Sequence, residues 1–188
     1  MEDINFQQFI LNKFSYSFSQ DKYFKVFIKS ISEKQFINFL KLLLKNGIDI
    51  ETKDSLGDKI IHHVVRNKCF NILEYLIDKG VNLDSVDVNG KAGIHIAASK
   101  NYWDIVKILV NHGAEINLRD EFNNSVIHYA CIQREWENVK WLIKKGADFY
   151  AKDSFGYDVL NYYNLQNKSD FFKWLESKEG EEKLLWLD

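Results

Sequence analysis

The sequence repeats itself every 33 residues, and this period restricts the possible folds more than any other feature. Aspartate recurs with this spacing at Asp21, Asp54, Asp87, Asp120 and Asp153. Glycine does so at Gly47, Gly80, Gly113 and Gly146, and histidine at His62, His95 and His128. Three residue types in one register indicate stacked copies of one small structural unit, because a fixed period of this length is the signature of a repeat protein.

Each unit begins with a turn and continues with two helical stretches. The turns read DSLG, DVNG, DEFN and DSFG, with aspartate first and glycine or asparagine fourth, as β-turns favour. The first apolar stretch carries the histidine. The second has apolar residues at helical spacing and ends at a glycine, which suits the left-handed backbone of a helix C-terminus. The sequence therefore predicts three repeats of two helices each, at 54–86, 87–119 and 120–152.

This pattern resembles the ankyrin-repeat family. GIHIAA, from Gly93 to Ala98, is the copy most similar to the family signature Thr-Pro-Leu-His-x-Ala, with Ala92 in the place of threonine. The Thr-Pro pair is missing from every repeat. The resemblance implies an all-α solenoid of stacked helix-turn-helix units with β-turn tips, in which the tips and the first helices line a concave face that binds a partner.

The two ends of the chain depart from the repeat pattern. Terminal units of a solenoid have one neighbour instead of two, so their exposed face needs a different sequence. We expect residues 1–20 to form an N-terminal capping helix and residues 21–53 a degenerate N-terminal capping repeat. Residues 153–188 are predicted to form a C-terminal capping repeat and a tail. Atypical capping units at both ends complete the predicted fold.

Composition argues against several classes of partner and location. The net charge of -2 gives no electrostatic footprint for nucleic acid or an anionic membrane surface. No apolar run approaches the roughly 20 residues of a membrane span, and the first residues do not read as a secretory signal. The two cysteines cannot form a disulfide framework, which favours a reducing compartment. We expect a cytoplasmic protein, of the producing cell or of a host, that is monomeric when unbound.

The sequence offers no catalytic, cofactor-binding or metal-binding residues. The repeated histidines occupy equivalent places in units stacked roughly 10 Å apart, so they cannot converge on one ion. We expect each imidazole to tie neighbouring turns together by hydrogen bonds. His63 and His112 lie in stretches that look exposed and are expected to have no role. Phosphate-loop, GxSxG and HExxH motifs are absent, and no local signature supports a Cys-His nucleophile pair. The chain is expected not to be an enzyme.

The candidate partner-binding residues come from the turn tips and the ends of the first helices. Several tips are apolar where a solvated turn would be polar, which is typical of a recognition surface. In the alternative interpretation, Phe122 and Phe155 fold back onto neighbouring repeats. The residues assigned to the site are Leu56, Asp58, Arg66, Val88, Asn89, Lys91, Lys100, Glu121, Phe122, Asn124, Gln133, Phe155 and Tyr157.

The sequence thus predicts a non-enzymatic module that binds another protein through its concave face and turn tips. A composition rich in Lys, Asn, Ile and Phe and without proline suits an AT-rich genome, and a bacterial or viral effector is one such setting. An immunity protein that plugs the active site of a toxin or enzyme is the first alternative. A regulatory subunit or small enzyme on a repeat scaffold is the second.

Overall fold

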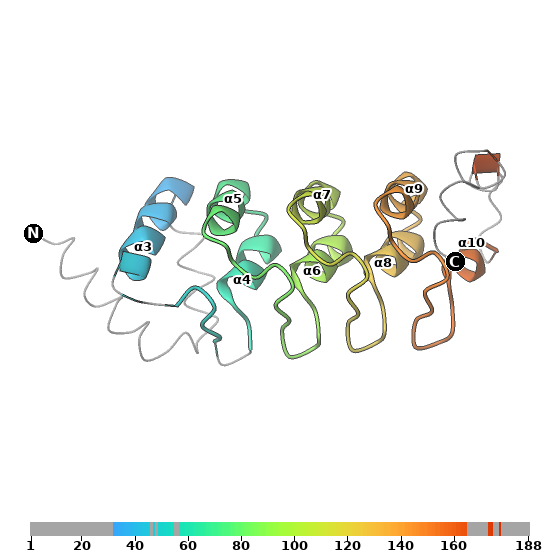
Figure 1. Cartoon of the computed structure of the whole chain (residues 1–188), viewed down its shortest axis with the longest axis horizontal. Helices are drawn as coiled ribbons and strands as arrows, with labels where there is room; N and C mark the ends of the chain where they lie inside the picture. Colours follow the sequence, from blue (N-terminus) through green and yellow to red (C-terminus); the bar gives the residue numbers. More distant parts are fainter. Residues whose placement is uncertain are drawn as a thin grey trace, which may run out of the picture. The chain divides into compact units, whose positions relative to one another are not determined.

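The computed structural model describes residues 32–45, 47, 49–54, 57–164, 173–174 and 177 (Figure 1). The chain divides into two compact units, 1–88 and 89–188. The regular structure of the described residues consists of eight helices and no strand. None of these helices has the length and apolarity needed to cross a membrane. The prediction of an all-α repeat fold is confirmed.

The first unit contains α3 (Glu33–Lys45), α4 (Ile60–Arg66) and α5 (Phe70–Asp78). The start of α3 is fixed by a reciprocal pair: Ser32 Oγ accepts the N–H of Gln35, and Gln35 Oε1 accepts the N–H of Ser32. Phe36, Leu40 and Leu43 follow each other at helical spacing and are buried. Both α3 and α4 pack against α5, so the apolar faces of all three helices share one core.

The second unit contains two complete helix pairs and the first helix of another. These are α6 (Gly93–Ser99), α7 (Trp103–Asn111), α8 (Val126–Ile132), α9 (Trp136–Lys144) and α10 (Val159–Asn164). Within this unit, α6, α8 and α10 lie in one row and α7 and α9 in another, while the turns project from one side (Figure 1). α8 packs against α6 and α10, which builds a continuous core from successive repeats.

The predicted capping units are only partly covered. α3 lies in the predicted N-terminal repeat and α10 in the predicted C-terminal repeat. The predicted capping helix at 1–20 and the end of the tail at 178–188 lie outside the described residues. The capping roles therefore stay predictions.

Candidate functional site

The three periodic histidines use both ring nitrogens on the backbone. In each case Nδ1 accepts the N–H of the residue three positions earlier: Lys59 to His62, Ala92 to His95 and Ser125 to His128, at 2.8, 3.1 and 3.1 Å. Nε2 lies 2.8–2.9 Å from a carbonyl 23 residues later, on Ser85, Leu118 and Ala151 respectively. Because Nδ1 accepts a hydrogen bond, it carries no proton; the proton is on Nε2, which donates it to the carbonyl oxygen, and the ring is neutral. The predicted structural role of these histidines is confirmed.

Asn161 stands where a fourth histidine would fall, and its contacts explain the change. Its Oδ1 accepts the N–H of Asp158 at 3.0 Å, as Nδ1 does in the other repeats. Its own N–H donates to Asp158 Oδ1 at 2.9 Å. The shorter side chain therefore keeps the cap at the start of α10.

The aspartate that opens each turn also uses its whole side chain. In the turn at Asp120, Oδ1 accepts the N–H groups of Phe122 and Asn124, each at 2.9 Å. In three of the four repeats, the second oxygen accepts a bond from the side chain nine residues later. These pairs are Asp54 with His63 at 2.9 Å, Asp120 with Tyr129 at 2.6 Å and Asp153 with Tyr162 at 2.5 Å.

The remaining repeat satisfies its aspartate in another way. Residue 96 is isoleucine and cannot donate a hydrogen bond, and Arg66 supplies one instead, from Nη2 to Asp87 Oδ2 at 2.9 Å. The same guanidinium binds both oxygens of Asp58. Arg66 therefore links the carboxylates of two successive turns, both nearly inaccessible to water.

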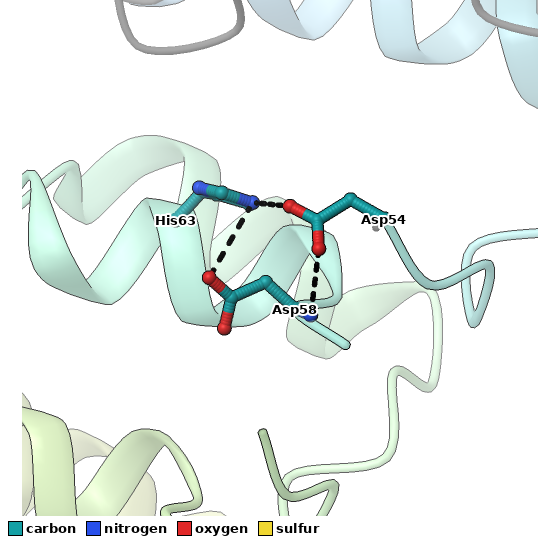
Figure 2. Close-up of side chains that lie close together, drawn as sticks. All are labelled: Asp54, Asp58 and His63. Carbon is teal, nitrogen blue, oxygen red and sulfur yellow. Dashed lines mark hydrogen bonds and ion pairs between the residues drawn. The ribbon is translucent and has the colours of Figure 1, made fainter. Parts of the chain in front are cut away.

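Asp54, Asp58 and His63 form the group of described residues whose spacing would allow a metal ion (Figure 2). All three are buried, and one ligand atom of each lies within 4.8 Å of the others. However, these side chains already have partners. Asp54 Oδ1 accepts a hydrogen bond from the Asp58 N–H at 2.8 Å, and Asp54 Oδ2 accepts one from His63 Nε2. Arg66 binds the carboxylate of Asp58. A metal ion would have to displace the His63 proton and compete with a bound cation. These contacts fit a support for the turn better than a metal centre.

This arrangement corrects one expectation. His63 was expected to be an exposed bystander, but it is fully buried and bonded to Asp54. His112 is exposed, as expected, at the end of α7. The physical reason for the difference is that His63 occupies the position from which Tyr129 and Tyr162 reach the aspartates of their own turns.

The buried histidines predict a pH dependence of stability. Burial lowers the pKa of His62 and His128 below 6.5. Below about pH 6.5 the unfolded chain therefore takes up protons that the folded chain refuses, and the free energy of unfolding falls as pH decreases. We expect a lower urea midpoint at pH 5.5 than at pH 7.5, a window above the range in which most carboxylates titrate. His112→Ala, which removes an exposed imidazole, should leave this difference unchanged. Equal midpoints at the two pH values would contradict the prediction.

The two cysteines show no sign of nucleophilic activation. Both are free thiols. Burial raises the pKa of Cys131, which lies in the core of α8, and burial also raises the pKa of the half-buried Cys69. Nucleophilic cysteines need a lowered pKa, because the thiolate is the reactive form. The environments of these two thiols fit small apolar side chains that fill space between the helices.

Three exposed aromatic side chains of the second unit stand on its turn tips. Phe122 is 51% exposed, Phe155 79% and Tyr157 43%. These fractions contradict the alternative in which the two phenylalanines are buried against neighbouring repeats. The backbone beneath them is fixed, since Asp153 Oδ1 accepts the N–H groups of Phe155 and Tyr157, and the Ser154 N–H donates to the Phe122 carbonyl at 3.0 Å. The rings therefore project from turns that are already ordered.

Comparison with known proteins agrees with this architecture. The family model for ankyrin repeats, in three copies, matches residues 27–120 and 89–153. The chain belongs to the ankyrin-repeat family. Ankyrin repeats are generally modules for protein-protein interaction and are typically not enzymes. Among curated proteins, none gives a significant sequence match to the chain.

Seven of the thirteen predicted partner-binding residues are exposed in this ankyrin-repeat fold: Val88, Asn89, Lys100, Glu121, Phe122, Phe155 and Tyr157. Three more are partly exposed: Lys91, Asn124 and Gln133. Asp58 is buried and bound by Arg66, so both have a structural role in the first unit. Leu56 lies outside the described residues.

The ends of the first helices were predicted to contribute to this surface, but Tyr129 and Tyr162, which lie within these helices, were missed. Tyr129 and Tyr162 are partly exposed beside the tips, and Ile132 on α8 is 50% exposed. A signal was available, because His63, Tyr129 and Tyr162 share one register and all can donate a hydrogen bond. That register marks the position where each first helix faces its own turn.

Proposed function

We propose that this ankyrin-repeat chain is a non-enzymatic protein-binding module and that the second unit holds its partner through a tip surface made of Phe122, Phe155 and Tyr157. The observation that carries the proposal is the exposure of two phenylalanines on hydrogen-bonded turns. An exposed aromatic ring on a mobile loop would be ordered at a cost on binding. Here the backbone is ordered beforehand, so a partner needs to restrict only the side chains.

The chemistry of the tip surface suits a protein partner. Buried aromatic anchors dominate many protein interfaces, and Phe122, Phe155 and Tyr157 place three exposed aromatic rings on two successive turns. The charged groups around them are of both signs, with Glu121 beside Phe122 and Lys152 before the next turn. Apolar anchors with a polar rim are the usual anatomy of an interface.

The test replaces both tip rings at once. We expect Phe122→Ala combined with Phe155→Ala to weaken partner binding by about 2 kcal/mol or more, roughly thirtyfold, because aromatic anchors contribute strongly at interfaces. The free energy of unfolding should change by only about 0.5 kcal/mol per substitution, since both rings are exposed. Affinity is measured by titration against the partner that the full chain retains in a pull-down.

Tyr150→Ala is the matched control, because Tyr150 is 50% exposed in the same unit but lies before the turn and not on its tip. It should leave the affinity unchanged. An unchanged affinity in the double variant would place the partner elsewhere and end the proposal. A large loss of stability would show that the rings belong to the core.

The effector, immunity and regulatory roles would use the same surface and differ in the partner it meets. Two free thiols fit a partner encountered in a reducing compartment such as the cytoplasm. The partner identified in the pull-down separates these roles. A host protein would indicate an effector, a toxin an immunity protein, and a metabolic enzyme a regulatory subunit.

A further inference from the structure

Tyr129 and Tyr162 each form a tyrosine–aspartate pair in equivalent places of the second unit. The Tyr129 hydroxyl donates to Asp120 Oδ2 at 2.6 Å, and the Tyr162 hydroxyl to Asp153 Oδ2 at 2.5 Å. A hydroxyl that donates to an ionised acceptor polarises its ring, and hydrogen bonds in such chains strengthen one another. The rings of these two partly exposed tyrosines are therefore electron-rich and attractive to a cation.

The first of these pairs already holds a cation. Lys91, from the preceding turn, places its Nζ over the Tyr129 ring, 5.7 Å from the centroid. This is within the range of a cation–π interaction, and the hydroxyl of the same ring donates to the carboxylate of Asp120. Within this protein, a tyrosine–aspartate pair of this kind therefore already binds an ammonium group.

The described residues supply no corresponding cation to the second pair. One period of 33 residues after Lys91 stands Asn124, which is neutral, just as Tyr162 stands one period after Tyr129. Among the described residues, none places an ammonium or guanidinium group over the Tyr162 ring. Arg119, which lies near this end of the unit, donates instead to the carbonyl oxygens of Asn123 and Lys152.

A second aromatic ring, that of Tyr157, lies next to Tyr162. The ring of Tyr157 lies 5.7 Å from that of Tyr162, with the two planes at 84°. In the preceding repeats this position holds Asn124 and Lys91, so only the last turn offers two rings at right angles. We name Asn124, Asp153, Tyr157 and Tyr162 the two-tyrosine site.

The charge state of the pair fits a cationic occupant. Burial raises the pKa of Asp153, but hydrogen bonds from Tyr162 and from the N–H groups of Tyr157 and Phe155 outweigh it, so the net shift is downward. Burial and the bond to Asp153 raise the pKa of Tyr162. At neutral pH the site therefore presents a carboxylate and a protonated phenol.

We propose that the two-tyrosine site binds an arginine or lysine side chain of the partner protein, over the Tyr162 ring, as Lys91 lies over Tyr129. The proposal rests on the proposed function, because Tyr157 belongs to both the site and the tip surface. Arginine fits best, since its planar guanidinium stacks on aromatic rings and is weakly hydrated.

The test uses NMR on the full chain with two peptides, acetyl-Gly-Arg-Gly-amide and its citrulline counterpart. Citrulline has nearly the shape of arginine but no charge. We expect the arginine peptide to shift the ring resonances of Tyr157 and Tyr162 at least threefold more per unit concentration than the citrulline peptide, at equal ionic strength. Equal responses to the two peptides, or no response at these rings, would overturn the proposal.

Asn124→Lys supplies the cation within the chain and gives an independent readout. The ε-methylene protons of the introduced lysine should show the upfield ring-current shift expected over an aromatic face, and the response to the arginine peptide should disappear. Asn124→Gln, of similar size and uncharged, should keep that response. An introduced lysine with ordinary chemical shifts would count against the site.

The outcome is separable from that of the proposed function. If Phe122→Ala with Phe155→Ala leaves partner affinity intact while the arginine peptide still shifts Tyr162, the tip surface is wrong and the cation site stands. If the double variant loses the partner but the peptide has no effect, the cation site alone is wrong.

Discussion

Arg66→Ala is expected to lower the free energy of unfolding by about 3 kcal/mol, because it leaves two buried carboxylates without their shared cation. The guanidinium binds both oxygens of Asp58 and, at 2.9 Å, Asp87 Oδ2. The side chains of Asp58 and Asp87 are only 5% and 3% exposed in the intact protein, so Arg66 supplies hydrogen bonds that water supplies to exposed carboxylates. Urea unfolding of the two proteins at pH 7.5 measures the difference.

The loss should come from the charges and not from the missing side-chain volume. Adding Asp58→Asn and Asp87→Asn to Arg66→Ala removes the unmatched charges and should recover part of the stability. Arg134→Ala, which removes an exposed arginine of the second unit, should change the free energy of unfolding by less than about 0.5 kcal/mol. A loss below about 1 kcal/mol for Arg66→Ala would show that the bridge is weak.

The role of Arg66 also shows where sequence reasoning stops. Its place at the end of a first helix predicted a surface residue, and the helix ends there, at Arg66. The register fixes where a residue lies along the repeat, but it does not say that Arg66 reaches the aspartate of the following turn, Asp87. That contact appears only when two turns are packed together.

Features that repeat in every unit were predictable from the sequence. Residues such as His95 and Asp120 recur because each repeat needs the same hydrogen bonds at its turn and at the start of its first helix. Their constant spacing identifies them in the sequence. The helix–helix turns were less visible. Lys68, Asn101 and Arg134 share one register and all have φ near +60°, yet lysine and arginine are not the residues that sterics favour there. Because no glycine stands at these positions, their left-handed backbone was not predictable from the repeat pattern.

The surface was predictable in part. Phe122 and Phe155 were assigned to the tips from register alone, and both are exposed. The two-tyrosine site was not found, because it depends on a difference between repeats. Lys91 covers the ring of Tyr129, whereas a neutral asparagine stands at the equivalent place before Tyr162. A repeat pattern reveals what units share, while binding specificity resides in what they do not share.

His95→Ala is expected to lower the free energy of unfolding by about 3 kcal/mol. The substitution leaves the buried Ala92 N–H without its acceptor, removes the donor to the Leu118 carbonyl, and opens a cavity of imidazole size. The exposed His112 provides the matched control, and His112→Ala should cost less than about 0.5 kcal/mol.

His95→Asn separates the two hydrogen bonds of the ring. Asn161 shows that an asparagine at this position can accept the backbone N–H three residues earlier. Its side chain is too short to replace the bond from His95 Nε2 to the Leu118 carbonyl. We therefore expect the free energy of unfolding of His95→Asn, measured by urea unfolding, to lie between that of the wild type and that of His95→Ala. Because both ring nitrogens are bound to backbone groups, a chelator should leave all the midpoints unchanged. A chelator-induced fall, or equal losses for asparagine and alanine, would contradict the assigned hydrogen bonds.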